Sequence, residues 1–139
     1  MMGVPLEGGS LFHGRYRILS TLGRGSFASV YLARDTEWKG NLVAVKEIST
    51  EGFSEQEFRE MNAQFLQEAA FLMRLEHPGL PHVVEFFAEK SRYYLVMEWI
   101  AGKTMHEQIH VKGPASEDEV VDWGLQLCEI LGYLHSRDP

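Results

Sequence analysis

The chain has 139 residues, enough for one domain or for a small lobe with part of a second. Its formal net charge of −7 makes a nucleic-acid-binding surface unexpected. The sequence has no run of about 18 apolar residues, so no membrane span is predicted. Its first residues lack the basic and apolar regions of a secretory signal. The single cysteine, Cys128, excludes an internal disulfide and a thiolate metal cage. We therefore expect a cytoplasmic protein without a metal site of its own.

A β-meander is predicted near the start of the chain. Residues 1–14 contain several glycines and a proline, so we expect a flexible segment there. Three stretches with strand-like composition follow at 15–22, 29–35 and 42–48, and turn-forming residues separate them. Consecutive short strands joined by tight turns are typical of an antiparallel sheet.

A long helix is predicted after the third strand. Ser54 and Glu57 have the spacing of a capping box, in which each side chain accepts a hydrogen bond from the backbone N–H of the other residue. The helix should end at His77, which Pro78 and Gly79 follow. One apolar stripe runs along it, formed by Phe58, Met61, Phe65, Ala69, Leu72 and Leu75.

The remaining elements complete the fold prediction. Two strands at 83–89 and 92–98 are joined by a two-residue turn. A short helix at 104–111 follows, and a second capping box at Ser116 and Glu119 begins a last, amphipathic helix. The predicted class is α+β: a five-stranded antiparallel sheet with one helix, followed by two further helices.

A glycine-rich turn joins the first two strands. Gly23 and Gly25 have no Cβ, so the backbone could approach a bulky anion there and direct its N–H groups at phosphate oxygens. Because the turn joins two strands, it is not the strand-to-helix loop of a dinucleotide-binding fold or of a P-loop. The alternative interpretation is an ordinary tight hairpin, since short glycine patterns often occur without a ligand.

Lys46 ends the apolar strand that contains Val43, Ala44 and Val45. Because side chains alternate along a strand, Ala44 and Lys46 lie on the same face. A small residue beside a cation favours a surface that admits a flat group next to an anion. The alternative is a lysine that points into solvent, which is the more common environment of this residue.

Glu68 lies on the apolar side of the predicted helix. It is three residues after Phe65 and four before Leu72, so we expect it to be buried or nearly so. A buried carboxylate needs a cation, and Lys46 on the neighbouring strand is the candidate. The alternative is a half-exposed glutamate at the edge of the stripe. Rival partners for the lysine are Glu57, Glu60 and Glu76.

The last strand of the predicted sheet runs through Met97 into a turn at Ala101 and Gly102. Its final backbone groups are not all used by sheet pairing, so a carbonyl and an amide could bind the edge of a planar heterocycle. By itself this segment would indicate only an ordinary strand-to-helix connection.

In this order and spacing, the four features resemble the N-terminal lobe of the eukaryotic-type protein kinases, of the serine/threonine kind also found in bacteria. The resemblance covers residues 15–138. The glycine turn matches the family's G-x-G-x-x-G-x-V at Gly23, Gly25 and Val30, with Ala28 in place of the third glycine. It implies an N-terminal lobe at 15–100 and the start of a C-terminal lobe at 101–139.

The resemblance also implies roles for individual residues. The strand Val43–Lys46 is similar to the family's V-A-I-K strand, which would place Lys46 on the α- and β-phosphates of ATP. Glu68 stands nine residues before His77, where the family's helix glutamate pairs with that lysine. The implied nucleotide-binding residues are Leu22, Gly23, Gly25, Val30, Ala44, Lys46, Met97, Glu98 and Ile100.

Two further motifs of the family, H-R-D-L-x-x-x-N and D-F-G, do not occur in this chain, and Arg137-Asp138-Pro139 contains only a part of the first. These motifs carry the catalytic base and the Mg²⁺ ligands. The resemblance therefore implies that a complete parent transfers the γ-phosphate of ATP to protein hydroxyls with the help of Mg²⁺. We expect this truncated chain to be inactive by itself.

Two other functions stay open at this point. The chain could be a non-catalytic kinase-like module that docks or regulates a partner, or an α+β interaction domain without a nucleotide. If the chain is instead part of a protein kinase, its partners are an adenine nucleotide and the protein substrate of the parent. The last helix carries an apolar face that predicts self-association, formed by Val120, Leu127, Ile130, Leu131 and Leu134.

Overall fold

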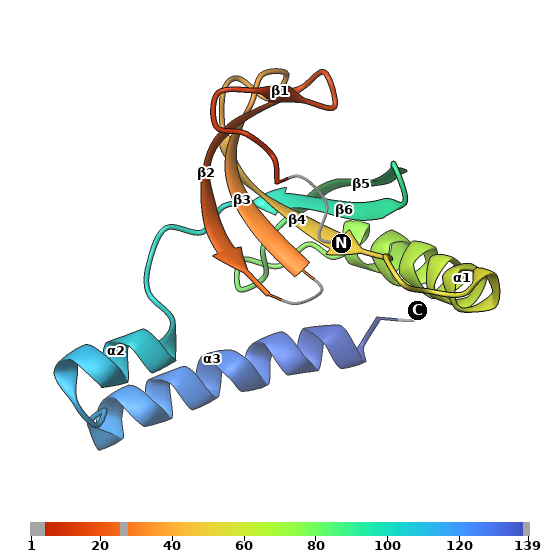
Figure 1. Ribbon diagram of the computed structural model, residues 1–139. Coiled ribbons are helices and arrows are strands. Elements are labelled where there is room, and N and C mark those ends of the chain that lie inside the picture. The colour runs from red at the N-terminus through yellow and green to blue at the C-terminus, as the bar shows by residue number, and fades with distance from the viewer. Residues whose placement is uncertain (1–4, 26–27, 138–139) are drawn as a thin grey trace. The chain divides into compact units, whose positions relative to one another are not determined.

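A computed structural model describes residues 5–25 and 28–137, and these form two compact units (Figure 1). The first unit runs up to Leu75 and continues with His82–Trp99. The second unit combines the short segment Glu76–Pro81 with the chain from Ile100 onward. Each unit has its own set of internal contacts, and the first contains the whole sheet.

The sheet has six strands, all antiparallel to their neighbours, in the order β1-β2-β3-β4-β6-β5. All five predicted strands are present, and the short strand β1 is an addition. Lys90 and Ser91, which form the predicted turn between the last two strands, both have positive φ. The strands are β1 Leu11–Phe12, β2 Tyr16–Arg24, β3 Ala28–Asp35, β4 Leu42–Ser49, β5 Val83–Glu89 and β6 Arg92–Glu98.

One face of the sheet forms the apolar core. Side chains alternate along each strand, and every second residue of β2, β3, β4 and β6 points to this face. These residues are almost inaccessible to water, apart from those of β2 after Ile18. Most of their neighbours on the other face are half-buried or exposed, and Tyr93 is the buried exception on β6. The core consists of Tyr16, Ile18, Tyr31, Ala33, Val43, Val45, Tyr94 and Val96.

Residues 5–14 form turns and the short strand β1. Strand β1 pairs with β2, and the Phe12 ring packs 4.7 Å from that of Tyr94 and 5.7 Å from that of Phe87. The backbone N–H of Leu6 donates to the Tyr31 hydroxyl. Burial of these apolar groups holds the segment against the curled sheet, although its glycines and proline favour turns. Residues 1–4 lie outside the described part of the chain.

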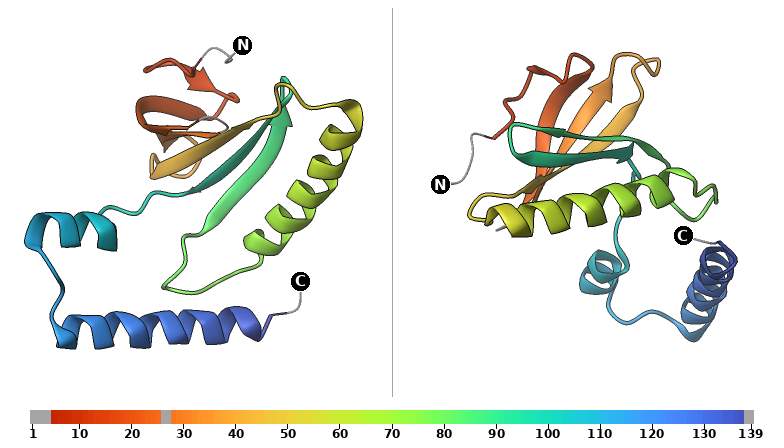
Figure 2. Two further views of the ribbon diagram at one scale, coloured as in Figure 1. Left: turned by 60° about the horizontal axis from the view of Figure 1, so that its bottom comes forward. Right: turned by 90° about the vertical axis from the view of Figure 1, so that its right-hand side faces the viewer.

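Helix α1, Glu55–Met73, packs against one side of the sheet along β5 and β6 (Figure 2). The predicted capping box is formed: Ser54 Oγ accepts from the Glu57 N–H, and the Glu57 carboxylate accepts from the Ser54 N–H. Ala69 is the only buried residue of the helix. The helix therefore rests on the sheet through a narrow line of contacts.

The second unit contains helices α2, Met105–Lys112, and α3, Glu117–His135, both begun by capping boxes. The segment Glu76–Pro81 is held to α3, because the Glu76 N–H donates to the Tyr133 hydroxyl at 2.7 Å. A Cβ at Gly79 would lie 2.6 Å from Ile130 Cδ1, so glycine permits this close approach. Within the described residues, no helix has both the length and the apolar character needed to cross a membrane.

Candidate functional site

Strand register places most of the predicted binding residues of the first unit on one face of the sheet. Lys46 lies opposite Val30 on β3, and Ala44 lies opposite Met97 on β6. Residues that face each other across antiparallel strands share a face. Gly23 extends this row, because it lies opposite Val30 on β2. The row lies on the face opposite the apolar core, where Gly23 is exposed and the other members are half-buried.

The glycine turn has room above it. Leu22 falls in a register shift of β2, between Thr21 and Gly23, and its side chain is exposed. A Cβ built at Gly23 would have no other atom within 4 Å, so packing within the chain does not require a glycine there. The N–H of Gly25 donates to the Ala28 carbonyl at 2.7 Å and closes the base of the turn. The tip, residues 26 and 27, lies outside the described residues.

Lys46 is half-buried and lies between Val30 and Leu95 in the register of the sheet. Among the residues that the structure describes, no ion pair joins it to Glu68 or to any other carboxylate. An ammonium group held between apolar side chains without an internal partner can bind an external anion.

Glu68 is exposed, so the expectation of a buried carboxylate is wrong. Its carboxylate accepts a hydrogen bond from Gln64 Nε2 at 3.0 Å, one turn earlier on the same helix. The residues that face the sheet are Phe58, Phe65 and Ala69. Successive helix residues are about 100° apart, which places Glu68 about a quarter turn from the middle of this row. The predicted stripe was centred too close to Glu68.

At the end of β6, Glu98 is held by His82. The Glu98 N–H donates to the His82 carbonyl at 2.8 Å, and its carboxylate accepts from the His82 N–H at 3.0 Å. The Trp99 N–H donates to the Leu42 carbonyl. The amide N–H of Glu98 is therefore used within the first unit. Ile100 begins the second unit and is exposed.

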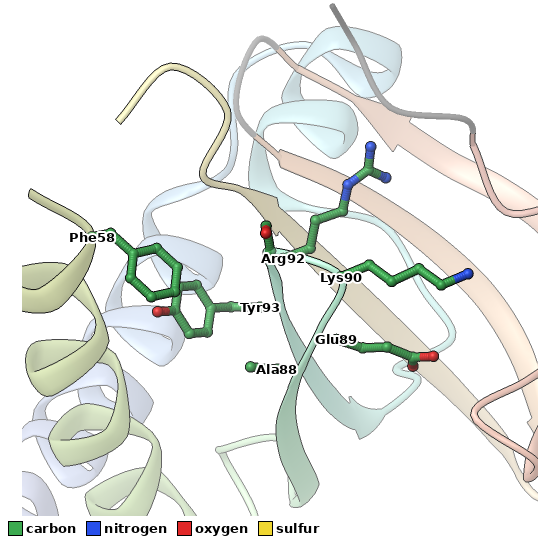
Figure 3. Close-up of a pocket in the computed structure, with 7 residues that line it drawn as sticks. Phe58, Ala88, Glu89, Lys90, Arg92 and Tyr93 are labelled. Carbon is green, nitrogen blue, oxygen red and sulfur yellow. The ribbon is translucent and has the colours of Figure 1, made fainter. Parts of the chain in front are cut away.

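A shallow pocket of about 190 Å³ lies between the start of α1 and the hairpin that joins β5 and β6 (Figure 3). The rings of Phe58 and Tyr93 lie on one side of the hairpin, whereas the side chains of Lys90 and Arg92 extend to the other. The pocket contains none of the predicted binding residues and lies at the opposite end of β6 from Met97. It is not the predicted nucleotide site.

Two buried carboxylates were missed by the sequence analysis, and both lie on the core face. Glu47 accepts hydrogen bonds from Arg92 Nη1 at 3.1 Å and from the Tyr94 hydroxyl at 2.9 Å. Asp35 accepts two hydrogen bonds from Arg15, each 2.8 Å long. The alternation of Val43, Val45 and Glu47 on one face of β4 was the signal that could have found the first. Both groups stabilise the sheet and neither borders the predicted site.

Comparison with known proteins identifies relatives over nearly the whole chain. The family described as "Protein kinase domain" matches residues 16–138. Serine/threonine-protein kinase B of Synechocystis is 31% identical over 127 residues, which are 90% of this chain and 22% of that protein. CBL-interacting protein kinase 11 of rice, Oryza sativa subsp. japonica, is 33% identical over 132 residues, which are 95% of this chain and 26% of that protein.

Solved structures give the same result for the fold. The crystal structure of the Mycobacterium tuberculosis PknI kinase domain matches with a TM-score of 0.79 and 25% sequence identity. The match covers 96% of this chain and 52% of that chain. The present chain therefore spans about half of the solved domain, and about a quarter of the curated relatives named above.

Proposed function

The chain belongs to the protein kinase domain family, and on this basis we propose that it carries part of the ATP-binding site of a serine/threonine protein kinase. The adenine would lie against Val30, Ala44 and Met97, with Leu22 above it and the backbone of Glu98 and Ile100 at its edge. The phosphates would lie between the glycine turn and Lys46.

The observation that carries this proposal is the row of Gly23, Val30 and Lys46 across three strands, with Ala44 and Met97 beside it on the same face. A flat, apolar surface next to an unpaired ammonium group suits a molecule with a planar ring and a polyphosphate. The open space at Gly23 provides the close backbone approach that phosphate binding requires.

The proposal assigns phosphoryl transfer to a complete parent kinase and not to these 139 residues alone. ATP would supply the γ-phosphate, and Mg²⁺ would neutralise its charge when bound to motifs that this sequence does not contain. The described residues contain no cluster of three or more side chains suited to hold a metal ion. In the parent, Lys46 would position the phosphates and Glu68 would orient Lys46. The parent would act on protein hydroxyls in the cytoplasm.

Calorimetric titration with a non-hydrolysable ATP analogue tests the proposal. Lys46→Met should weaken binding about tenfold to a hundredfold, because one charge-assisted contact to phosphate is lost. Lys90→Met is the matched control, since Lys90 lies in the turn between β5 and β6, away from the site, and it should bind as the wild type does. Equal affinity of the Lys46 variant and the wild type would contradict the proposal.

A non-catalytic docking or regulatory module is the second candidate. The exposed Glu68, which does not pair with Lys46 here, favours it. An experiment in which the chain is supplied with the rest of a kinase C-terminal lobe distinguishes the two candidate functions. Phosphate transfer to a protein substrate supports the kinase, and nucleotide-independent partner binding without transfer supports the module.

Self-association through α3 is a further expectation. The side chains of Val120, Leu127 and Leu131 are exposed and lie on one side of the helix. Apolar patches of this kind promote association in water. Sedimentation velocity should show dimers or larger species at high concentration, and Leu127→Glu with Leu131→Glu should shift them to monomers. A wild-type chain that stays monomeric throughout would contradict this expectation.

A further inference from the structure

Tyr93 on β6 is the residue on which the first half of α1 rests. Its side chain is almost completely buried, with 1% of its surface exposed. Its ring lies 5.9 Å from that of Phe58 and 4.5 Å from that of Phe65, measured between centroids. Its hydroxyl donates a hydrogen bond to Asn62 Oδ1 at 2.9 Å. Figure 3 shows Phe58 and Tyr93 beside each other at the start of the helix.

These three contacts all lie on one side of α1 and orient that side toward Tyr93. Phe58, Asn62 and Phe65 are spaced by four and three residues, so they lie on one side of the helix. While this side faces Tyr93, Glu68 is turned about a quarter of a revolution away from the sheet. The observed exposure of Glu68 follows directly from this orientation.

Tyr93 and Lys46 lie on the same face of the sheet. Tyr93 is two residues from Leu95 on β6, and Leu95 is directly opposite Lys46 on β4. Helix α1 therefore packs on the face that carries Lys46. A rotation of the helix in place would bring Glu68 toward that lysine without moving the helix to another side of the sheet.

We propose that the Tyr93–Asn62 hydrogen bond is a positioning contact, which holds α1 in the rotation where Glu68 does not face Lys46, and that its loss favours the Lys46–Glu68 pair. This inference rests on the proposed function of Lys46, because it concerns the residue that would orient it. The hydrogen bond carries the effect because it is directional, whereas the ring contacts with Phe58 and Phe65 tolerate sliding and rotation. Burial raises the pKa of the Tyr93 hydroxyl, which keeps it protonated and able to donate.

Tyr93→Phe is the discriminating variant, because it removes the hydroxyl and keeps the ring stack. Its effect can be measured without a nucleotide, in a Cys128→Ser chain with Lys46→Cys and Glu68→Cys joined by a short bismaleimide. We expect the crosslinking rate to rise about threefold to tenfold with Tyr93→Phe, as the loss of one hydrogen bond allows. An unchanged or slower rate would overturn the inference.

Tyr94→Phe is the matched control, since it removes a buried hydroxyl from the next residue on the opposite face of the sheet. It should leave the crosslinking rate unchanged, and an increase equal to that of Tyr93→Phe would attribute the effect to general loosening and overturn the proposal.

Titration with the ATP analogue provides the second readout. Tyr93→Phe should raise affinity about threefold, and this gain should vanish with Glu68→Gln. Faster crosslinking without Lys46-dependent binding would support the positioning contact and reject the proposed function. A gain in affinity that persists with Glu68→Gln would reject the positioning contact alone.

Discussion

Replacing Asp35 with alanine is expected to lower the free energy of unfolding by about 3–5 kcal/mol. The carboxylate is completely buried and accepts two hydrogen bonds from Arg15 at 2.8 Å. It also accepts from the backbone N–H groups of Glu37 and Trp38, at 3.0 and 3.1 Å. The alanine variant would leave the Arg15 guanidinium without its main partner and two N–H groups of the following turn without acceptors. Chemical denaturation followed by tryptophan fluorescence measures the loss.

Glu37→Gln is the control for this measurement. Glu37 is also near Arg15, with 3.5 Å between Arg15 Nε and its carboxylate, but its side chain is 68% exposed. Exposed ion pairs contribute little, so the change should stay below about 1 kcal/mol. A similar loss in the two variants would show that net charge near Arg15 matters more than the buried hydrogen bonds.

The same carboxylate makes the stability depend on pH. Burial alone raises the pKa of Asp35, but the hydrogen bonds from Arg15 and from two backbone N–H groups outweigh burial, and the pKa lies below its usual value. Such a group contributes its full stability above the unfolded-state pKa of about 3.9, and the contribution is lost as the pH falls through the folded-state pKa. Below about pH 4 the wild type should lose stability with falling pH more steeply than Asp35→Asn does. Equal slopes would contradict the assignment.

The second large effect is expected at Glu47. Its side chain is almost completely buried, and its carboxylate accepts from Arg92 Nη1 at 3.1 Å and from the Tyr94 hydroxyl at 2.9 Å. Replacement by alanine would leave a nearly buried guanidinium and a buried hydroxyl without their acceptor. We expect a loss of about 3–5 kcal/mol in the free energy of unfolding, measured by thermal and chemical denaturation.

A double variant separates the two causes of this loss. Glu47→Leu together with Arg92→Met replaces both charges by apolar groups, and such replacements of buried pairs are often close to neutral. The double variant should therefore be more stable than Glu47→Ala. If it is equally unstable, loss of packing around Tyr94 accounts for the effect, and the unpaired charge does not.

The fold was largely predictable because its signals are local. The capping boxes of α1 and α3 are predicted by a serine and a glutamate three residues apart, whereas the one formed by Thr104 and Glu107 at α2 was missed. The alternation in β4 predicts that Ala44 and Lys46 share a face, as the register places them. Short turns then set the register of neighbouring strands, as the turn at Lys90 and Ser91 does for β5 and β6.

The errors arose where tertiary contacts outweigh local pattern. Strand β1 is stabilised because Phe12 packs against the rings of Phe87 and Tyr94, which are far away in sequence. The exposure of Glu68 depends on which side of α1 Tyr93 contacts, and a stripe of six apolar residues does not fix that side within a quarter turn. The local spacing of residues therefore suggested the Lys46–Glu68 pair, but it could not predict whether the two side chains face each other.

The packing of the N-terminal segment affects where a recombinant version of this protein should begin. The family match starts at residue 16, which would suggest a cut that removes Leu6 and Phe12. Such a cut would uncover the rings of Phe87 and Tyr94 and leave β2 as a bare edge, available for intermolecular strand addition. Aggregation of the shortened protein would then reflect the choice of its first residue and would say nothing about the kinase fold itself.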